Sequence, residues 1–207
     1  MAQTQQLTLN QSNTIRKTIV ANVGTEANQR TLELGKSSFL PIGKDTYYNL
    51  HGLRFVFKLK GDSAIRLDRS IYHGSNFNRF LFQHGNRIMC LGGYGQFVTN
   101  NNLEAFNTTS REWYLIRTTG DVPKTIKGSC IQTNNYIYVL NNCIDGNNLA
   151  ETKSDEYFYR LDLNDFSWTK YKEFRKDFIN TPVHDFFYLE DYIVAKGGIF
   201  SFIYNLK

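Results

Sequence analysis

Cysteine and long apolar runs are both scarce in this chain of 207 residues. No run approaches the roughly 20 apolar residues that a helix needs to cross a bilayer, so no membrane insertion of this segment is predicted. Three cysteines cannot build a disulfide framework and allow at most one intrachain pair. Cys90 lies inside the apolar run RIMCL and is predicted to be a buried thiol. Cys130 and Cys143 are the candidates for a bridge across neighbouring strands, at a distance that sequence does not reveal.

Clustered charge is also absent. The 24 basic and 19 acidic residues give a net charge of +5 and are spread singly along the chain. Nucleic-acid-binding proteins usually gather their basic residues, so nucleic acid is not an expected partner. The N-terminus MAQTQQ lacks the charged and apolar regions of a signal peptide. It is similar to a mature exported chain to which a start Met has been added, so we expect a secreted or periplasmic location, with a cytoplasmic one as the alternative.

Aromatic residues, in contrast, are abundant. Thirteen Tyr and sixteen Phe stand against two Met, a balance that suits strand surfaces better than helix bundles. Between Arg79 and Arg117, four short apolar runs are separated by breaks that hold Gly, Asn, Thr or Ser. This pattern predicts a unit of four strands and an all-β fold.

The unit from Arg79 to Arg117 resembles a kelch repeat. Its second run ends in Gly92-Gly93 before Tyr94, its third carries Phe106 and its fourth opens with Trp113. The resemblance implies a kelch-type β-propeller of about four blades, each a four-stranded antiparallel sheet. Trp168 follows Trp113 by about 55 residues, near the roughly 50 of a kelch repeat, and both are predicted to pack between blades. The double glycine lacks the order of a phosphate-binding loop and is predicted to form a tight turn.

We expect residues 1–207 to form a single kelch-like domain. The predicted parts are an N-terminal segment (1–30), a degenerate blade (38–69), two blades (79–117 and 128–171) and an incomplete blade (185–207). Two N-terminal strands are predicted, at Gln6–Asn10 and Thr18–Val23, and one of them would complete the last blade and close the ring. The alternative is a partial propeller from a longer chain, whose open blade edge invites self-association.

Antiparallel strands place all the long links of this pattern on one rim, and binding residues tend to lie in long loops on a rigid scaffold. These links are Tyr94–Asn101, Thr118–Lys127, Cys143–Asp155 and Lys172–His184. The candidate ligand-binding residues on this rim are Tyr94, Phe97, Lys124, Asp145, Glu151 and Lys153.

The predicted function is non-catalytic binding of a protein or an extracellular ligand through this rim, in the sensing or anchoring part of a larger exported protein. The alternative is a carbohydrate-directed enzyme or an oxidase, because the resemblance to kelch propellers also implies sugar-directed chemistry or copper oxidation. Copper would need Tyr, His and Cys together, and Tyr94, Cys143 and His184 match no such motif. His51 and His73 lack metal-ligand spacing. No catalytic residue, metal or other cofactor is therefore expected.

Overall fold

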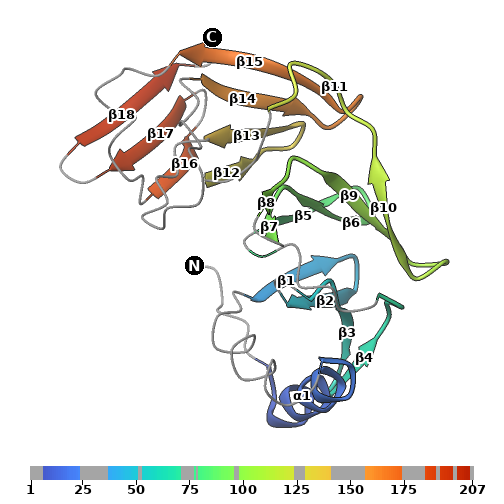
Figure 1. Ribbon diagram of the computed structural model, residues 1–207. Coiled ribbons are helices and arrows are strands. Elements are labelled where there is room, and N and C mark those ends of the chain that lie inside the picture. The colour runs from blue at the N-terminus through green and yellow to red at the C-terminus, as the bar shows by residue number, and fades with distance from the viewer. Residues whose placement is uncertain are drawn as a thin grey trace. The chain divides into compact units, whose positions relative to one another are not determined.

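The computed structural model describes residues 7–23, 37–50, 53–70, 77, 79–95, 98–123, 129–140, 157–173, 185–189, 192–197 and 200–205. Every described element after residue 36 is a strand, and the strands form largely antiparallel sheets, two of them four-stranded, which confirms the all-β class (Figure 1). The chain divides into two compact units. The first comprises Met1–Gln96 and Asn102–Ile116, and the second comprises Phe97–Asn101 and Arg117–Lys207.

The first unit contains two sheets that are simple antiparallel meanders. The first sheet has the order β1-β2-β3-β4 and the second has the order β10-β9-β6-β5. The first sheet consists of β1 (Ser37–Ile42), β2 (Asp45–Leu50), β3 (Val56–Lys60) and β4 (Ser63–Arg66). The second consists of β5 (Phe80–His84), β6 (Arg87–Leu91), β9 (Leu103–Asn107) and β10 (Glu112–Ile116).

The double glycine after β6 adopts a positive-φ backbone at the start of the link that spans residues 92–102. Gly92 has φ 64° and Gly93 has φ 112°, values that other residues rarely adopt. The Gly92 N–H donates to the Asn102 carbonyl at 2.9 Å, so the link from β6 to β9 is held together at its base. This link also holds the two-residue strands β7 (Tyr94–Gly95) and β8 (Val98–Thr99).

A helix, α1 (Leu9–Val23), occupies the N-terminal segment, so the strands expected at Gln6–Asn10 and Thr18–Val23 were a wrong prediction. Thr8 and Gln11 form a capping box at its start: the Thr8 N–H donates to Gln11 Oε1, and the Gln11 N–H donates to Thr8 Oγ1. Gln11, Ile15 and Ile19 are buried and recur every four residues, which aligns them along one helical face.

This helical face packs on the first sheet (Figure 1). Ile15 and Ile19 join a buried cluster with Tyr48, Leu53, Phe55, Phe57 and Ala64. The Gln11 side chain also donates to the Gly61 carbonyl in the β3–β4 turn, at 2.7 Å. One face of the first sheet is therefore covered by α1, and this explains why the segment is helical.

The opposite face of the first sheet packs on the second sheet. Val56, Ile88 and Phe106 are buried at the centre of this contact. Partly buried apolar side chains surround them, namely Leu40, Ile42, Tyr47, Leu67, Leu81 and Trp113. Both faces of the first sheet are thus covered within the first unit.

The second unit also contains two sheets. The third sheet, in the order β11-β15-β14-β13-β12, consists of β11 (Thr119–Gly120), β12 (Ser129–Gln132), β13 (Tyr136–Leu140), β14 (Tyr157–Asp162) and β15 (Ser167–Glu173). The fourth consists of β16 (Asp185–Leu189), β17 (Tyr192–Gly197) and β18 (Phe200–Asn205). The third sheet differs from the predicted four-stranded blade because β11 adds a parallel strand beside β15. Gly120 permits this approach, since a Cβ there would lie 2.3 Å from the Trp168 carbonyl oxygen.

The turns that precede the two tryptophans share one backbone geometry. Each begins with Asn107 or Asp162, whose carbonyl accepts a hydrogen bond from the residue four positions later, at 2.8 and 3.0 Å. Those later residues, Arg111 and Phe166, have φ 63° and 59°, and each stands two positions before its tryptophan.

The same two residues also accept hydrogen bonds from the segment that precedes each sheet. The Arg69 N–H donates to the Arg111 carbonyl, and the Thr119 N–H donates to the Phe166 carbonyl, at 2.9 and 3.3 Å. The left-handed residue in each turn therefore anchors the preceding link. The second and third sheets therefore share this turn geometry as well as the antiparallel order of four of their strands.

Candidate functional site

Most of the predicted rim lies outside the described residues. Tyr94 begins β7, where the structure describes the backbone. The other five predicted ligand-binding residues lie outside the described ranges, namely Phe97, Lys124, Asp145, Glu151 and Lys153. The same holds for Cys143, His184, His51 and His73, and for Asn141-Asn142, which stands where the next repeat would place its double glycine. The rim site and the Cys130–Cys143 pairing stay predictions.

The structure describes in detail a buried polar cluster in the first unit, between the first and second sheets. We call it the polar junction. Its members come from both sheets and the links beside them: Asn49, Arg54, Arg79, Cys90, Glu104 and Trp113.

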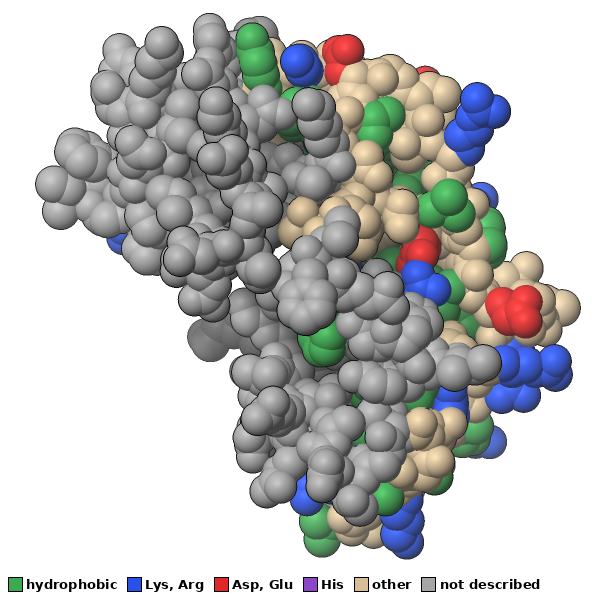
Figure 2. All heavy atoms as spheres, viewed as in Figure 1, with side chains coloured by type: hydrophobic (Ala, Val, Ile, Leu, Met, Phe, Trp, Pro, Cys, Tyr) green, Lys and Arg blue, Asp and Glu red, His purple; other side chains and the backbone are tan. Residues whose placement is uncertain are grey.

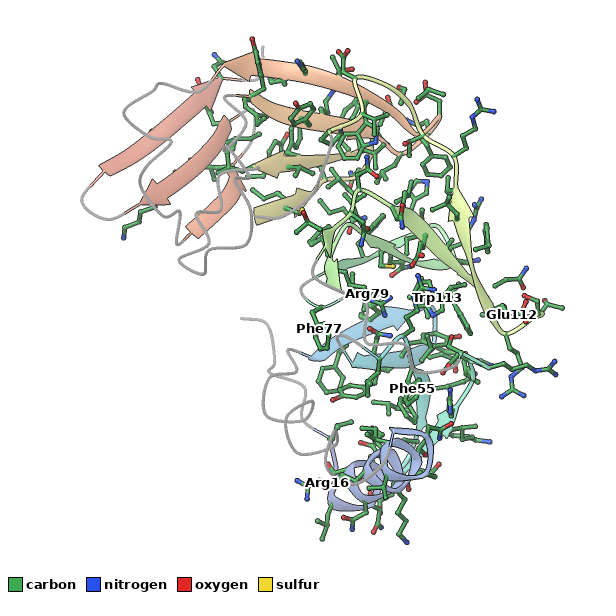
Figure 3. The ribbon with its side chains drawn as sticks, in the orientation of Figure 1. Arg16, Phe55, Phe77, Arg79, Glu112 and Trp113 are labelled. Carbon is green, nitrogen blue, oxygen red and sulfur yellow. The ribbon has the colours of Figure 1, made fainter. Side chains whose placement is uncertain are left out.

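Arg79 is the centre of the polar junction. It is only 1% exposed, although a guanidinium is among the groups most costly to bury. Its Nη2 donates to Asn49 Oδ1 at 2.9 Å, and its Nη1 lies 3.5 Å from Cys90 Sγ. The guanidinium also lies over the Trp113 ring, 4.8 Å from the ring centroid (Figure 3). Such a cation–π contact away from water stabilises by about 2 kcal/mol.

Glu104 supplies the negative charge of the polar junction. Its carboxylate forms an ion pair with Arg54 and accepts a weak hydrogen bond from Cys90 Sγ at 3.5 Å. Burial raises the pKa of Cys90 to about 12, and the neighbouring Glu104 charge acts in the same direction. The thiol therefore stays protonated at neutral pH and can act as the donor between Arg79 and Glu104.

A hydrogen bond from the Trp113 side chain to the Arg54 backbone connects the two sheets. Arg54 has φ 61°, a left-handed conformation that costs a residue with a side chain roughly 1–2 kcal/mol. In this conformation its carbonyl accepts a hydrogen bond from Trp113 Nε1 at 3.0 Å. Trp113 also contacts Phe106, with ring centroids 5.5 Å apart. The predicted packing role of Trp113 is confirmed at this contact between two sheets, where the side chain is partly buried.

A second buried charge, Asp68, organises the chain where it leaves the first sheet. Its carboxylate accepts hydrogen bonds from the backbone N–H groups of Val56 and Ser70, at 2.8 and 3.0 Å. Arg66 donates to both oxygens of the same carboxylate and also covers the Phe55 ring, 3.9 Å from its centroid. Asp68 therefore holds β3 and the link after β4 together.

In the second unit, tyrosines line the contact between the third and fourth sheets. Tyr138 and Tyr188 stack nearly parallel, with centroids 6.5 Å apart and an interplanar angle of 12°. Arg160 lies over Tyr136 and Tyr171, at 4.8 and 5.4 Å. On the other face of the third sheet, Trp168 is 2% exposed, which confirms that it is a packing residue.

The described residues contain no group of three or more His, Cys, Asp or Glu side chains that could hold a metal ion. Within the same ranges, no helix combines the length and apolar character needed to cross a membrane. On the face shown in Figure 2, the described Lys and Arg side chains are interspersed with Asp, Glu and neutral ones. This distribution agrees with the single, scattered charges of the sequence.

Reasoning from the sequence missed the polar junction. Its members lie far apart along the chain, and only Glu104, a carboxylate between Leu103 and Ala105, stands out locally. A charge within an apolar run that is otherwise suited to a buried strand was the available signal.

No protein-family model matches this chain, and its sequence matches no curated protein.

Proposed function

We propose that this chain is a kelch-type propeller module that binds a protein or an extracellular ligand without catalysing a reaction. In this proposal the ligand contacts the long-link rim, and the module is the sensing or anchoring part of a larger exported protein. A fold of this kind serves many activities, so the proposal depends on features of this chain and not on fold alone.

The observation that carries the proposal is the difference between the two ends of the second and third sheets. At one end, the first two strands of each sheet are joined by a turn of a few residues: His84 pairs with Arg87, and Gln132 with Ile137. At the other end, the links from second to third strand span residues 92–102 and 141–156, whereas the corresponding links of the first and fourth sheets, 51–55 and 198–199, are short. Tight turns leave little surface for a ligand, whereas long links on rigid sheets provide one.

The buried charges of the first unit support a binding scaffold. Arg79, Glu104 and Asp68 are each engaged by side chains or backbone groups that join strands or sheets. These interactions hold the sheets in one arrangement, and a rigid support lowers the ordering cost of binding at the rim.

The proposal is tested by screening the purified chain against a glycan array and a panel of purified extracellular proteins. A triple rim variant (Asp145→Ala, Glu151→Ala, Lys153→Ala) is then compared with the parent for each partner found. We expect its affinity to fall by about tenfold or more, because charged contacts at an interface each contribute on the order of 1 kcal/mol or more.

The matched control changes charges at the tight-turn end, with Lys44→Ala and Arg87→Ala in one chain. Both residues are exposed there, and the control should bind like the parent. Equal loss of binding in the control would contradict the assignment to the rim. Formation of hydrogen peroxide from an oxidisable sugar in the presence of copper would favour the oxidase alternative.

A further inference from the structure

The β9–β10 turn carries a motif that the proposed function leaves unused. Its triplet Asn107-Thr108-Thr109 has the Asn-X-Thr order of an N-glycosylation acceptor, in which X is not Pro. A second triplet of this kind, Asn10-Gln11-Ser12, lies at the start of α1. Such triplets also arise by chance, so the surroundings of each asparagine decide which of them can carry a glycan.

The side-chain amide nitrogen of Asn107 faces solvent. Asn107 Oδ1 accepts hydrogen bonds from the backbone N–H groups of Thr109 and Ser110, at 2.8 and 3.0 Å. An amide oxygen accepts and an amide nitrogen only donates, so these two donors identify the oxygen and leave Nδ2 on the outer side. No described residue accepts a hydrogen bond from Nδ2, and residues 107–110 are all exposed. An oligosaccharide bonded to Nδ2 therefore displaces no contact of the described residues.

The turn itself is held by other atoms. The Asn107 carbonyl accepts a hydrogen bond from the Arg111 N–H at 2.8 Å. The Arg111 side chain donates to the carbonyls of Leu67 and Arg66. Glu112, labelled in Figure 3, is the register partner of Asn107 on β10. None of these contacts involves Nδ2, so they remain when that atom is modified.

The surroundings of Asn10 are different. Its Nδ2 donates to the Asp62 carboxylate in the β3–β4 turn. The next residue, Gln11, is buried and donates to the Gly61 carbonyl in the same turn at 2.7 Å. A glycan on Asn10 would crowd the contact that joins the start of α1 to this turn. The structure therefore favours Asn107 over Asn10 as the acceptor.

We propose that Asn107 is an N-glycosylation site. This inference rests on the export that the proposed function includes, because Asn-X-Thr acceptors are used in surface loops of secreted proteins. In the transfer step, Nδ2 forms a bond to C1 of the first sugar of an oligosaccharide carried on a lipid pyrophosphate. The bond between C1 and the pyrophosphate oxygen breaks, the lipid pyrophosphate leaves with that electron pair, and one Nδ2 proton passes to a base of the transferase. The product carries a bulky, solubilising group on its surface.

The glycan and the 92–102 link of the rim lie at opposite ends of β9, which begins at Leu103 and ends at Asn107. Glycosylation should therefore leave binding at the rim unchanged. A chain that is glycosylated at Asn107 but binds no partner contradicts only the proposed function. A chain that binds at the rim but carries no glycan contradicts only this inference.

To test the proposal, the full chain is expressed behind a cleavable signal peptide in cultured animal cells, and both the secreted and the cell-associated protein are analysed. Treatment with peptide N-glycosidase should lower the mass of the parent, and peptide mass spectrometry should find Asn107 converted to Asp. Thr109→Ala removes the acceptor motif while keeping Asn107 and should lose the glycan. Thr109→Ser keeps the hydroxyl and should retain it. Circular dichroism verifies that each variant is folded.

Asn10→Gln is the matched control and should carry the glycan at Asn107 like the parent. A parent without a glycan at Asn107 in either fraction overturns the proposal. So does a glycan at Asn107 that persists in Thr109→Ala, or one that is found at Asn10 alone.

Discussion

Replacing Glu104 with Gln removes the negative charge of the polar junction while keeping its shape. The two guanidinium groups, of Arg54 and Arg79, then remain beside an apolar contact between two sheets. Removing one partner of a buried ion pair costs more than the pair contributes, because the remaining charge is left in a poor solvent.

The expected loss of unfolding free energy follows from the distances between Glu104 and the two guanidinium groups. Glu104 contacts Arg54 directly, and its side chain is 10% exposed against 20% for Arg54. The Cys90 thiol lies between Arg79 and Glu104, so the Arg79 guanidinium is no more than about 7 Å from the carboxylate. At that distance the two opposite charges attract by about 2 kcal/mol at an effective dielectric constant of about 20. Broken buried pairs cost about 3–5 kcal/mol, and the partial exposure of Arg54 places Glu104→Gln near about 3 kcal/mol.

Arg79→Met provides a contrast within the same cluster. It removes a buried charge together with its hydrogen bond to Asn49 and its contact with the Trp113 ring, but it leaves the Arg54–Glu104 ion pair intact. The lost hydrogen bond costs about 1.5–3 kcal/mol and the lost ring contact about 2 kcal/mol, and relief from burying the guanidinium, several kcal/mol, offsets most of this. Arg79→Met should therefore destabilise the first unit less than Glu104→Gln.

Urea denaturation followed by tryptophan fluorescence measures these effects. A Trp168→Phe chain serves as the parent, so that the signal comes from Trp113 in the first unit. Glu112→Gln on the exposed end of β10 is the matched control and should stay within about 0.5 kcal/mol of the parent. A Glu104→Gln variant as stable as this control, or more stable than Arg79→Met, would refute the role assigned to the charge.

Three further predictions concern packing, backbone and pH. Trp113→Ala and Trp168→Ala should each lower the free energy of unfolding by about 3–5 kcal/mol in denaturant titrations, and a loss under about 1 kcal/mol would contradict burial between sheets. Gly120→Ala should destabilise the chain more than Gly85→Ala. Both glycines have positive φ, but of the two only Gly120 would place the added Cβ 2.3 Å from a carbonyl oxygen, that of Trp168. Equal melting temperatures of the two variants would show that β11 is not held against Trp168. Burial raises the pKa of Cys90 to about 12, so between about pH 9 and 12 the thiol is protonated in the folded chain and ionised in the unfolded one. The stability that this thiol contributes is therefore present below pH 9 and is lost as pH rises from about 9 to 12. The slope attributable to this thiol approaches about 1.4 kcal/mol per pH unit and should be absent in Cys90→Ala; identical pH profiles would argue against its burial.

Local sequence determined the strands and many of the turns. Short apolar runs with aromatic and β-branched residues, separated by Gly and Asn, are nearest-neighbour signals, and they predicted the four strands between Arg79 and Arg117. The φ values of Gly92 and Gly93 show why glycine marks the end of β6, because few other residues adopt them. The sequence also predicted that both tryptophans pack, and Trp168 is buried while Trp113 is partly buried.

The N-terminal helix was only partly readable from sequence. The Thr8–Gln11 capping box and the four-residue spacing of Ile15 and Ile19 are both visible in the amino-acid order. Yet the segment is rich in Asn, Thr and other weak helix formers, and α1 has no acidic residue in its first turn and no basic residue in its last. Its helical state depends on burying Ile15 and Ile19 against Tyr48 and Phe57, a contact made after the first sheet exists.

Only the tertiary structure decided the polar junction and the exposure of side chains on the fourth sheet. Arg79 lies 30 residues from Asn49, and Arg54 lies 50 residues from Glu104, so no local pattern relates them. A buried charge is tolerated only where its partners converge, and sheet packing, not strand formation, brings these side chains together. The same reason applies to Leu189 and Ile203: alternation within a strand assigns them to a face, but their exposure depends on which sheets pack beside that face.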